Sequence, residues 1–119
     1  MRRALRHDDG GRARFAGTAV WAPSGGGLRC VEEGTLAVGA SAMPARRETV
    51  WAVEGGALAV RFPDGRPFHA AGEGWSEHPC APDLYRIRYA WGANRFAMRW
   101  HVRGPRKAYR AVTWHWRAG

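Results

Sequence analysis

Apolar and polar residues alternate along most of this chain, in short runs that recur about every ten residues. A period of two sends successive side chains to opposite faces and is typical of a half-buried β-strand. No segment of about a dozen residues repeats with the 3.6-residue period of a helix. Turn sequences rich in Gly, Pro, Asn and Asp separate the runs. The pattern predicts about eight or nine antiparallel strands, at residues 3–7, 13–21, 28–38, 46–53, 57–62, 66–70, 85–91, 95–103 and 107–116.

A meander of this kind closes most naturally into an up-and-down barrel, because closure removes the exposed strand edges. We therefore expect one all-β domain over residues 1–119. Gly17 and Gly34 lie inside predicted strands, where glycine marks the bends that closed barrels need. A barrel of this size either holds one small ligand or is filled by side chains. A flattened two-sheet sandwich is the alternative, since the same pattern fits both.

The stretch from Phe68 to Tyr85 concentrates polar and reactive side chains. Pro79 and Pro82 remove backbone donors, so we expect a shaped loop here and not a strand. This loop joins the strand that ends near residue 70 to the strand that begins at Tyr85, so those two strands are expected to be neighbours. Near their facing ends we predict a cluster at one mouth of the barrel, formed by His69, His78, Asp83 and Tyr85 together with Arg47.

The loop suits several kinds of chemistry. The candidates for proton transfer are His69, His78, Asp83 and Tyr85, with the carboxylate holding one imidazole in a fixed tautomer. Cys80 beside a histidine has the residue types of an activated thiol nucleophile. The spacing matches no zinc pattern, so no metal site is predicted, and nothing selects a haem over a packed histidine. In the simplest interpretation the histidines and Asp83 only cap local backbone groups.

A second candidate is an ion pair on the inward face of the barrel. Glu32 shares its strand face with Leu36 and Val38, and Arg47 shares its face with Trp51. If these faces point inward, neither charge is tolerable alone, so the two must pair. The pair either lines a buried pocket or lies partly wet at a barrel end.

The chain also holds seven tryptophans, which is many for so small a core. Some must fill the barrel while others line a cavity or lie on the surface. Lys107, the only lysine, follows Arg106 in a proline-led turn. These two side chains either clamp an anionic group at the barrel mouth or close the barrel end over a tryptophan. The predicted ligand-binding residues are Glu32, Arg47, Trp51, His69, His78, Cys80, Tyr85, Trp100, Arg106 and Lys107.

The formal net charge is +9, and the basic residues are 18 arginines and one lysine scattered through the chain. Many alternate with apolar neighbours, which sends them to the solvent face. No nucleic-acid recognition motif accompanies them, so we expect weak, sequence-blind binding of polyanions that salt abolishes, and no specific nucleic-acid partner. No apolar run is long enough to span a membrane, and the N-terminus lacks an apolar signal segment. Cys30 and Cys80 are expected to be reduced thiols in a cytoplasmic protein.

Three motifs in the second half of the chain resemble one family. They are Phe68-His69, the pattern His78-Pro79-Cys80 with Pro82-Asp83 and Tyr85, and Gly104-Pro105-Arg106-Lys107. Together they resemble an uncharacterised family of small bacterial and fungal proteins, known only as a domain of unknown function, over nearly the whole chain. Its members look like calycins, the lipocalin-type barrels, so the resemblance implies a barrel and a set of positions but no reaction. The chain differs in having Ala108 where an acidic residue often stands, and in lacking a segment that usually precedes Met1.

The first functional hypothesis is a cytoplasmic calycin-like barrel, a monomer or homodimer, that binds a small, partly apolar, anionic molecule. Aromatic residues would line its cavity, with Arg47, Arg106 and Lys107 facing the anion. The alternative is a small-barrel enzyme, an isomerase, cyclase or lyase, that uses the histidine, aspartate and tyrosine cluster. A third hypothesis is a filled barrel that acts on a protein partner through its surface. The sequence identifies no cofactor.

Overall fold

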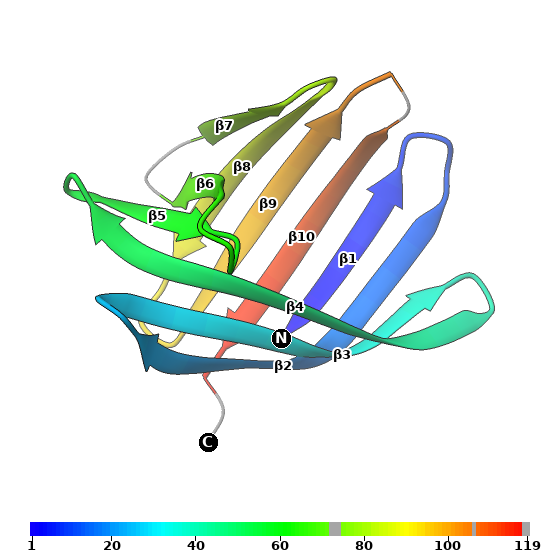
Figure 1. Ribbon diagram of the computed structural model, residues 1–119. Coiled ribbons are helices and arrows are strands. Elements are labelled where there is room, and N and C mark those ends of the chain that lie inside the picture. Colours follow the sequence, from blue (N-terminus) through cyan, green and yellow to red (C-terminus); the bar gives the residue numbers. More distant parts are fainter. Residues whose placement is uncertain (72–74, 106, 118–119) are drawn as a thin grey trace.

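Strands make up most of the molecule (Figure 1). The computed structural model describes residues 1–71, 75–105 and 107–117. Within these ranges no helix is long and apolar enough to cross a membrane. The strands are β1 (Arg2–His7), β2 (Arg12–Ser24), β3 (Gly27–Val38), β4 (Ser41–Glu54), β5 (Ala57–Arg61), β6 (Pro67–Ala71), β7 (Trp75–Cys80), β8 (Asp83–Trp91), β9 (Arg95–Arg103) and β10 (Ala108–Trp116).

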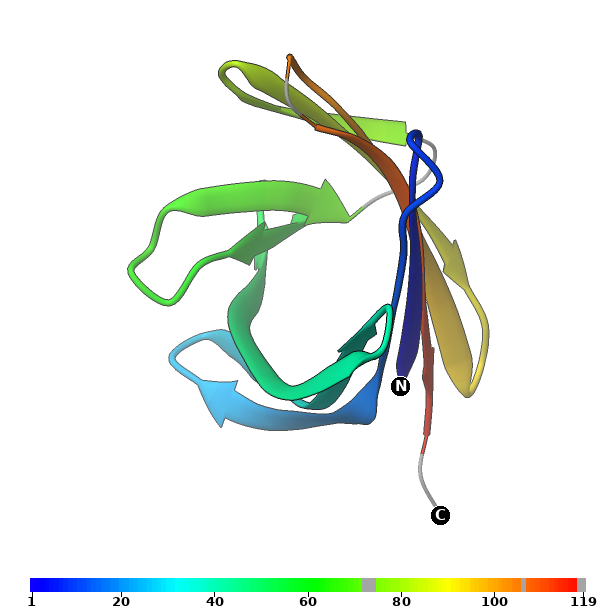
Figure 2. The same cartoon turned by 90° about the vertical axis from the view of Figure 1, so that its right-hand side faces the viewer.

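All ten strands belong to one antiparallel sheet with the order β6-β5-β4-β3-β2-β1-β10-β9-β8-β7. Strands that follow each other in the sequence are paired, except β6 and β7, and β1 also pairs with β10. The first and last strands therefore lie side by side in the middle of the sheet (Figure 1). The sheet curls until the edge strands β6 and β7 approach each other, as Figure 2 shows. The predicted all-β, up-and-down barrel is confirmed, as a sheet that is nearly but not fully closed.

Most predicted strands agree with the observed ones to within a few residues, but two predictions of loops are wrong. β4 begins at Ser41 and not at residue 46, so the stretch that the predicted strands at 28–38 and 46–53 left as a loop is only a tight turn. Gly39 has a φ of 58° in this turn, a conformation that glycine adopts without strain. The second error is β7, a strand in the stretch that the two prolines led us to predict as a loop.

β7 shows why proline misleads at this position. The strand pairs with β8 in a register that places His78 opposite Tyr85 and Pro79 opposite Leu84. Because β7 is an edge strand, a residue without an N–H is tolerated there. The strands that carry Phe68 and Tyr85 are consequently not hydrogen-bonded neighbours, and they lie on opposite sides of the gap in the barrel.

β2, β3 and β4 are long strands that bend around the interior (Figure 2). Gly17 and Gly34 lie opposite each other in the β2–β3 pair. A methyl group on Gly17 would collide with the carbonyl of Glu33, and one on Gly34 would collide with the carbonyl of Ala16. The backbones of β2 and β3 thus approach so closely that only glycine fits, in accord with the bend predicted from these two residues.

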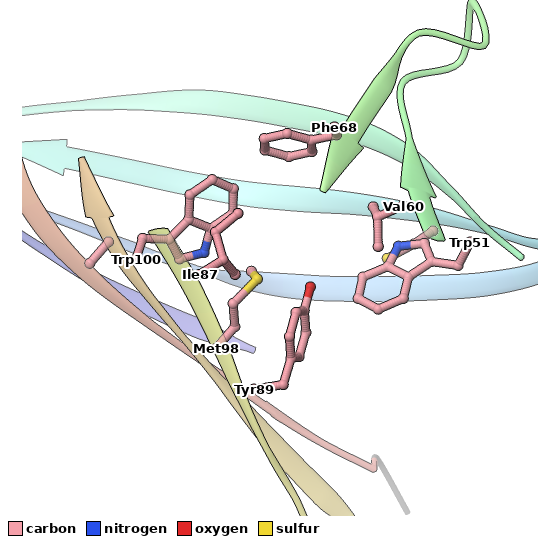
Figure 3. Close-up of a cluster of buried hydrophobic side chains, with 9 residues drawn as sticks. Trp51, Val60, Phe68, Ile87, Tyr89, Met98 and Trp100 are labelled. Atoms are coloured by element: carbon pink, nitrogen blue, oxygen red, sulfur yellow. The ribbon is translucent and has the colours of Figure 1, made fainter. Parts of the chain in front are cut away.

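Large side chains fill the concave side of the sheet between its two halves (Figure 3). Trp51 packs edge-on against Tyr89 with ring centroids 5.8 Å apart, and Phe68 packs against Trp100 at 5.1 Å. Aromatic pairs at such distances stabilise a core beyond the area they bury. They connect β4 and β6 to β8 and β9, so the core holds the curled sheet together across its interior. The buried cluster consists of Cys30, Trp51, Val60, Phe68, Ile87, Tyr89, Met98, Trp100 and Ala111.

Candidate functional site

A charged cluster lies among the side chains that point into the barrel. Glu32 in β3 stands directly opposite Arg47 in β4. The Nε and Nη2 atoms of Arg47 each donate a hydrogen bond to the Glu32 carboxylate at 3.1 Å. Arg3 in β1 donates to the same carboxylate from Nη2 at 2.7 Å, and to Oγ1 of Thr113 from Nε at 2.8 Å. The ion pair expected between Glu32 and Arg47 is therefore present, with a second arginine added to it.

The two arginines keep Glu32 ionised in the interior. Burial opposes ionisation, since only 4% of the residue is exposed. The positive charges of Arg47 and Arg3 outweigh that cost and hold the pKa of the Glu32 carboxyl below its usual value. Burial and the nearby Arg47 charge lower the pKa of Arg3, but a guanidinium stays protonated in proteins. The cluster thus has two positive charges and one negative charge, and carries an excess of about one positive charge.

A cavity of ≈ 250 Å³ lies against this cluster. Its polar lining is formed by Arg3, Glu32 and Arg47, together with Tyr109 and with Arg46, which is paired with Glu33 and Glu48. The remaining lining is apolar and comes from six of the strands around it. This apolar lining consists of Leu5, Ala13, Phe15, Leu36, Ala45, Trp100 and Ala111.

Arg47 is the most accessible member of the cluster. About a third of its side chain is exposed, 35%, against 19% for Arg3 and 6% for Glu32. Its guanidinium carbon lies 5.7 Å from the centre of the Trp100 ring and 5.9 Å from that of Phe68, which are cation–π distances. Glu32 uses two of the five N–H donors of this guanidinium. Arg47 is consequently oriented by its neighbours and still has donors to offer to a ligand.

His69 in β6 is a buried histidine of the core. Its Nε2 lies 2.5 Å from the hydroxyl of Tyr89, across the gap between β6 and β8. Burial, with the Arg47 charge as a smaller cause, lowers the pKa of His69 to about 3, and burial raises the pKa of Tyr89. Both side chains are therefore neutral near pH 7. In the part of the chain that the structure describes, His69 Nδ1 and Trp100 Nε1 are buried without a hydrogen-bond partner.

A separate polar corner is formed by Asp83, Tyr85 and Lys107, near the turns that join β7 to β8 and β9 to β10. Lys107 Nζ lies 3.6 Å from the Asp83 carboxylate. Tyr85 and Asp83 together raise the pKa of Lys107. A side chain on Gly104 would meet the Asp83 carboxylate, which would have to shift to make room. His78 faces this corner from β7, with its ring centroid 6.1 Å from that of Tyr85.

The predicted site residues fall into three places in the structure. Glu32, Arg47 and Trp100 line the cavity. Trp51 and His69 are buried in the core. Asp83, Tyr85 and Lys107 form the polar corner with His78 beside them, so the structure brings these four together and places His69 elsewhere. The Cys80 side chain and the whole of Arg106 lie outside the described residues.

Sequence reasoning missed Arg3, Phe15 and Tyr109 as lining residues of the cavity. Arg3 and Leu5 are two positions apart in a predicted strand, which indicates that they share a face. The spacing does not show whether that face points inward. That orientation depends on the pairing of β1 with β10, a contact between the two ends of the chain. No local signal could have shown it.

Comparison with known proteins gives a family and no function. No curated protein and no solved structure matches this chain. The model of one family, described as a family of unknown function (DUF6314), matches residues 1–117. This match confirms the resemblance to an uncharacterised family that the motifs indicated. The chain therefore belongs to the DUF6314 family.

Proposed function

We propose that this protein binds a small, partly apolar anion in the cavity beside Glu32, as calycin barrels hold ligands in their interior. The observation that carries the proposal is the charge of the cavity wall. Two guanidinium groups share one carboxylate there, so an incoming anion completes the neutralisation of the cluster. The rest of the lining is apolar and includes the Phe15 and Trp100 rings, which matches a ligand with an anionic head and an apolar body.

The size of the cavity limits the ligand. The volume of ≈ 250 Å³ is that of a small cavity. It falls just below the usual range for drug-sized molecules, about 300–1,000 Å³. The proposed ligand is therefore a compact carboxylate or phosphate ester, with an apolar part about as large as one ring.

Arg47 is the residue that would contact the anionic head. Arginine presents a planar fork of donors that matches a carboxylate or phosphate in bidentate geometry. The contacts with Glu32, Trp100 and Phe68 hold that fork in place before a ligand arrives, which reduces the entropy lost on binding. The Tyr109 hydroxyl is a further candidate donor at the cavity.

The alternative is an isomerase, cyclase or lyase. The protonation and the hydrogen-bond or ion-pair partners of the candidate catalytic residues favour binding over this alternative. His69 is neutral, buried and paired with Tyr89. Within the described residues the ion-pair partner of Asp83 is Lys107 and not a histidine. A general base needs a pKa near the working pH and reach to the substrate, and His69 with a pKa of about 3 lacks the first.

The test uses benzoate as the anionic probe and benzamide as its neutral counterpart, with isothermal titration calorimetry as the measurement. Wild-type protein is expected to bind benzoate at least about tenfold more tightly than benzamide, because a charge-assisted hydrogen bond is worth about 1.5–3 kcal/mol. Arg47→Gln should remove that preference. Arg61→Gln is the matched control, since Arg61 forms an exposed pair with Glu54 and does not line the cavity.

Equal affinity for benzoate and benzamide in the wild-type protein would contradict the proposal. So would a benzoate preference that Arg47→Gln leaves intact, since the anion would then be held elsewhere. Amide chemical shifts in a two-dimensional NMR spectrum locate the site independently, and the Trp100 indole signal is expected to move when benzoate is added.

A further inference from the structure

The arginines that are scattered in the sequence gather on one outer face of the barrel. Strands β8, β9, β10, β1 and β2 form one continuous wall (Figure 1). The strand register aligns one residue from each strand of this wall into a row that crosses it. From β8 to β2, that row is Arg86, His101, Arg110, Arg6 and Arg12.

A second row runs beside the first, displaced by two residues in every strand toward the same end of the wall. Arg88 is opposite Arg99, Arg99 is opposite Val112, and Arg14 ends the row in β2. All of the arginines in the two rows are exposed. Like charges directly opposite each other in a sheet destabilise it, so this arrangement costs the free protein stability.

The other half of the barrel neutralises its arginines. Arg29 and Arg46 bind Glu48, Arg61 binds Glu54, and Arg66 binds Asp64. In the part of the two rows that the structure describes, one ion pair is present: Arg86 with Glu77, at 3.7 Å. The positive charge that is left without a counter-charge is therefore concentrated on the outer face of β8, β9, β10, β1 and β2.

His101 lies in the middle of these positive charges. It sits in the first row between Arg86 and Arg110, with Arg99 and Arg103 on its own strand. Burial and then the charges of these four arginines lower the pKa of His101. The histidine therefore stays neutral and presents a flat ring among cations.

Exposed aromatic rings are interleaved with the charges. The Trp75 ring lies 4.8 Å from the His101 ring and 5.0 Å from the Arg86 guanidinium carbon. Trp114 projects from the same face with 44% of the residue exposed. At the end of the wall, a hollow of ≈ 700 Å³ has Trp91, Trp114 and Trp116 in its lining, with Arg95 beside them.

From this arrangement we propose that the outer face of β8, β9, β10, β1 and β2 binds single-stranded nucleic acid without sequence preference. The arginine rows hold the phosphates, and the exposed rings stack against unpaired bases. Bases in a duplex are already stacked and present only edges, so the aromatic rings favour a single strand. This face is on the opposite side of the sheet from the cavity, so the two proposals stand independently.

The test measures the fluorescence anisotropy of a labelled oligothymidylate of about 20 nucleotides, with salt varied from about 50 to about 200 mM. Binding is expected to weaken steeply with salt, because each neutralised phosphate contributes a slope of about −0.7 on a log–log scale. The triple variant Arg6→Gln/Arg99→Gln/Arg110→Gln should bind at least about tenfold more weakly, and its slope should be shallower by about 2.

The matched control is the triple variant Arg29→Gln/Arg46→Gln/Arg61→Gln. It removes the same formal charge from the protein but acts on the half where arginines are paired. It should bind the oligonucleotide as the wild-type protein does. If the two triple variants lose affinity equally, only the net charge matters and the proposed face is wrong.

A second arm tests the aromatic contacts. Trp114→Ala should weaken oligothymidylate binding about fivefold or more, because base–aromatic stacking is lost. An abasic strand with the same number of phosphates should bind more weakly than oligothymidylate. Equal binding of the abasic strand, tighter binding of a duplex, or binding to phosphatidylserine vesicles but not to the oligonucleotide would each overturn the proposal. Without any variant, the Trp114 indole NMR signal should shift on adding oligothymidylate while that of Trp100 stays in place.

Discussion

At the scale of single residues, Glu32 decides the charge of the barrel interior. Within the residues that the structure describes, it is the one carboxylate that contacts Arg3 and Arg47, both of which reach the cavity. A buried ion pair brings little net stability by itself, but removal of one partner leaves the others uncompensated. Glu32 is therefore expected to matter far more for stability than the neighbouring Glu33, which is exposed and pairs with Arg46.

The substitution Glu32→Gln tests this expectation. It should lower the free energy of unfolding by about 3 kcal/mol, because two guanidinium groups lose their counter-charge in the interior. Glu33→Gln should change it by less than about 1 kcal/mol, as is usual for an exposed pair. Urea denaturation near pH 7 measures both values. Equal effects of the two substitutions would show that the interior is wet enough to solvate the arginines.

At the scale of strands, the curvature of the barrel depends on the contact between Gly17 and Gly34. Both residues lie where β2 and β3 approach too closely for a side chain. The bend turns the β3–β4 half of the sheet back over the interior (Figure 2). The same bend brings Glu32, two residues before Gly34, to face β1 and Arg3.

Gly34→Ala should accordingly destabilise the protein by about 1–3 kcal/mol, the usual cost of forcing extra atoms into a packed site. Gly26→Ala is the matched control, since that turn residue has open space around it and lacks a positive φ. Thermal unfolding followed by circular dichroism compares the two variants. A Gly34 variant as stable as the Gly26 variant would mean that the strands can separate at no cost.

The elements also show which features the sequence could predict. Alternation is local, so it identified nine of the strands, and it placed Glu32 and Arg47 each on a strand face that also carries apolar residues. The effect of Pro79 depends on whether its strand lies at an edge, which is a property of the whole sheet, so β7 was missed. For the same reason Arg3 was not assigned to the cavity, and the arginine rows were taken for scattered charge. Both depend on registers between strands that are distant in the sequence.

At the scale of the whole molecule, two buried histidines make stability depend on pH. Burial lowers the pKa of His69 to about 3 and that of His115 to about 4, from an ordinary value of 6.5. The unfolded chain takes up these protons below about pH 6.5, whereas the folded chain does not. The contribution of the two neutral histidines to stability is therefore fully present above that pH. It declines as the pH falls toward the pKa values of the folded protein.

Between pH 8 and pH 5 the free energy of unfolding should fall by about 4 kcal/mol, about half from each histidine. His115→Phe should remove about half of this decline, since the new ring can keep the stacking on Phe96, which lies 4.4 Å away. Urea denaturation at several pH values provides the measurement. An unchanged pH profile in the variant would show that His115 takes up a proton without unfolding.

The gap between β6 and β7 has a consequence for how the protein behaves at high concentration. Each edge strand leaves backbone N–H and C=O groups open to a strand from another molecule, which is the usual first step of β-aggregation. Here both edges are short, and each contains a proline, Pro67 in β6 and Pro79 in β7. A proline has no N–H to offer to an incoming strand. The two prolines therefore leave fewer donors at the open edges for a strand of a neighbouring molecule, which limits extension of the sheet from one molecule to the next.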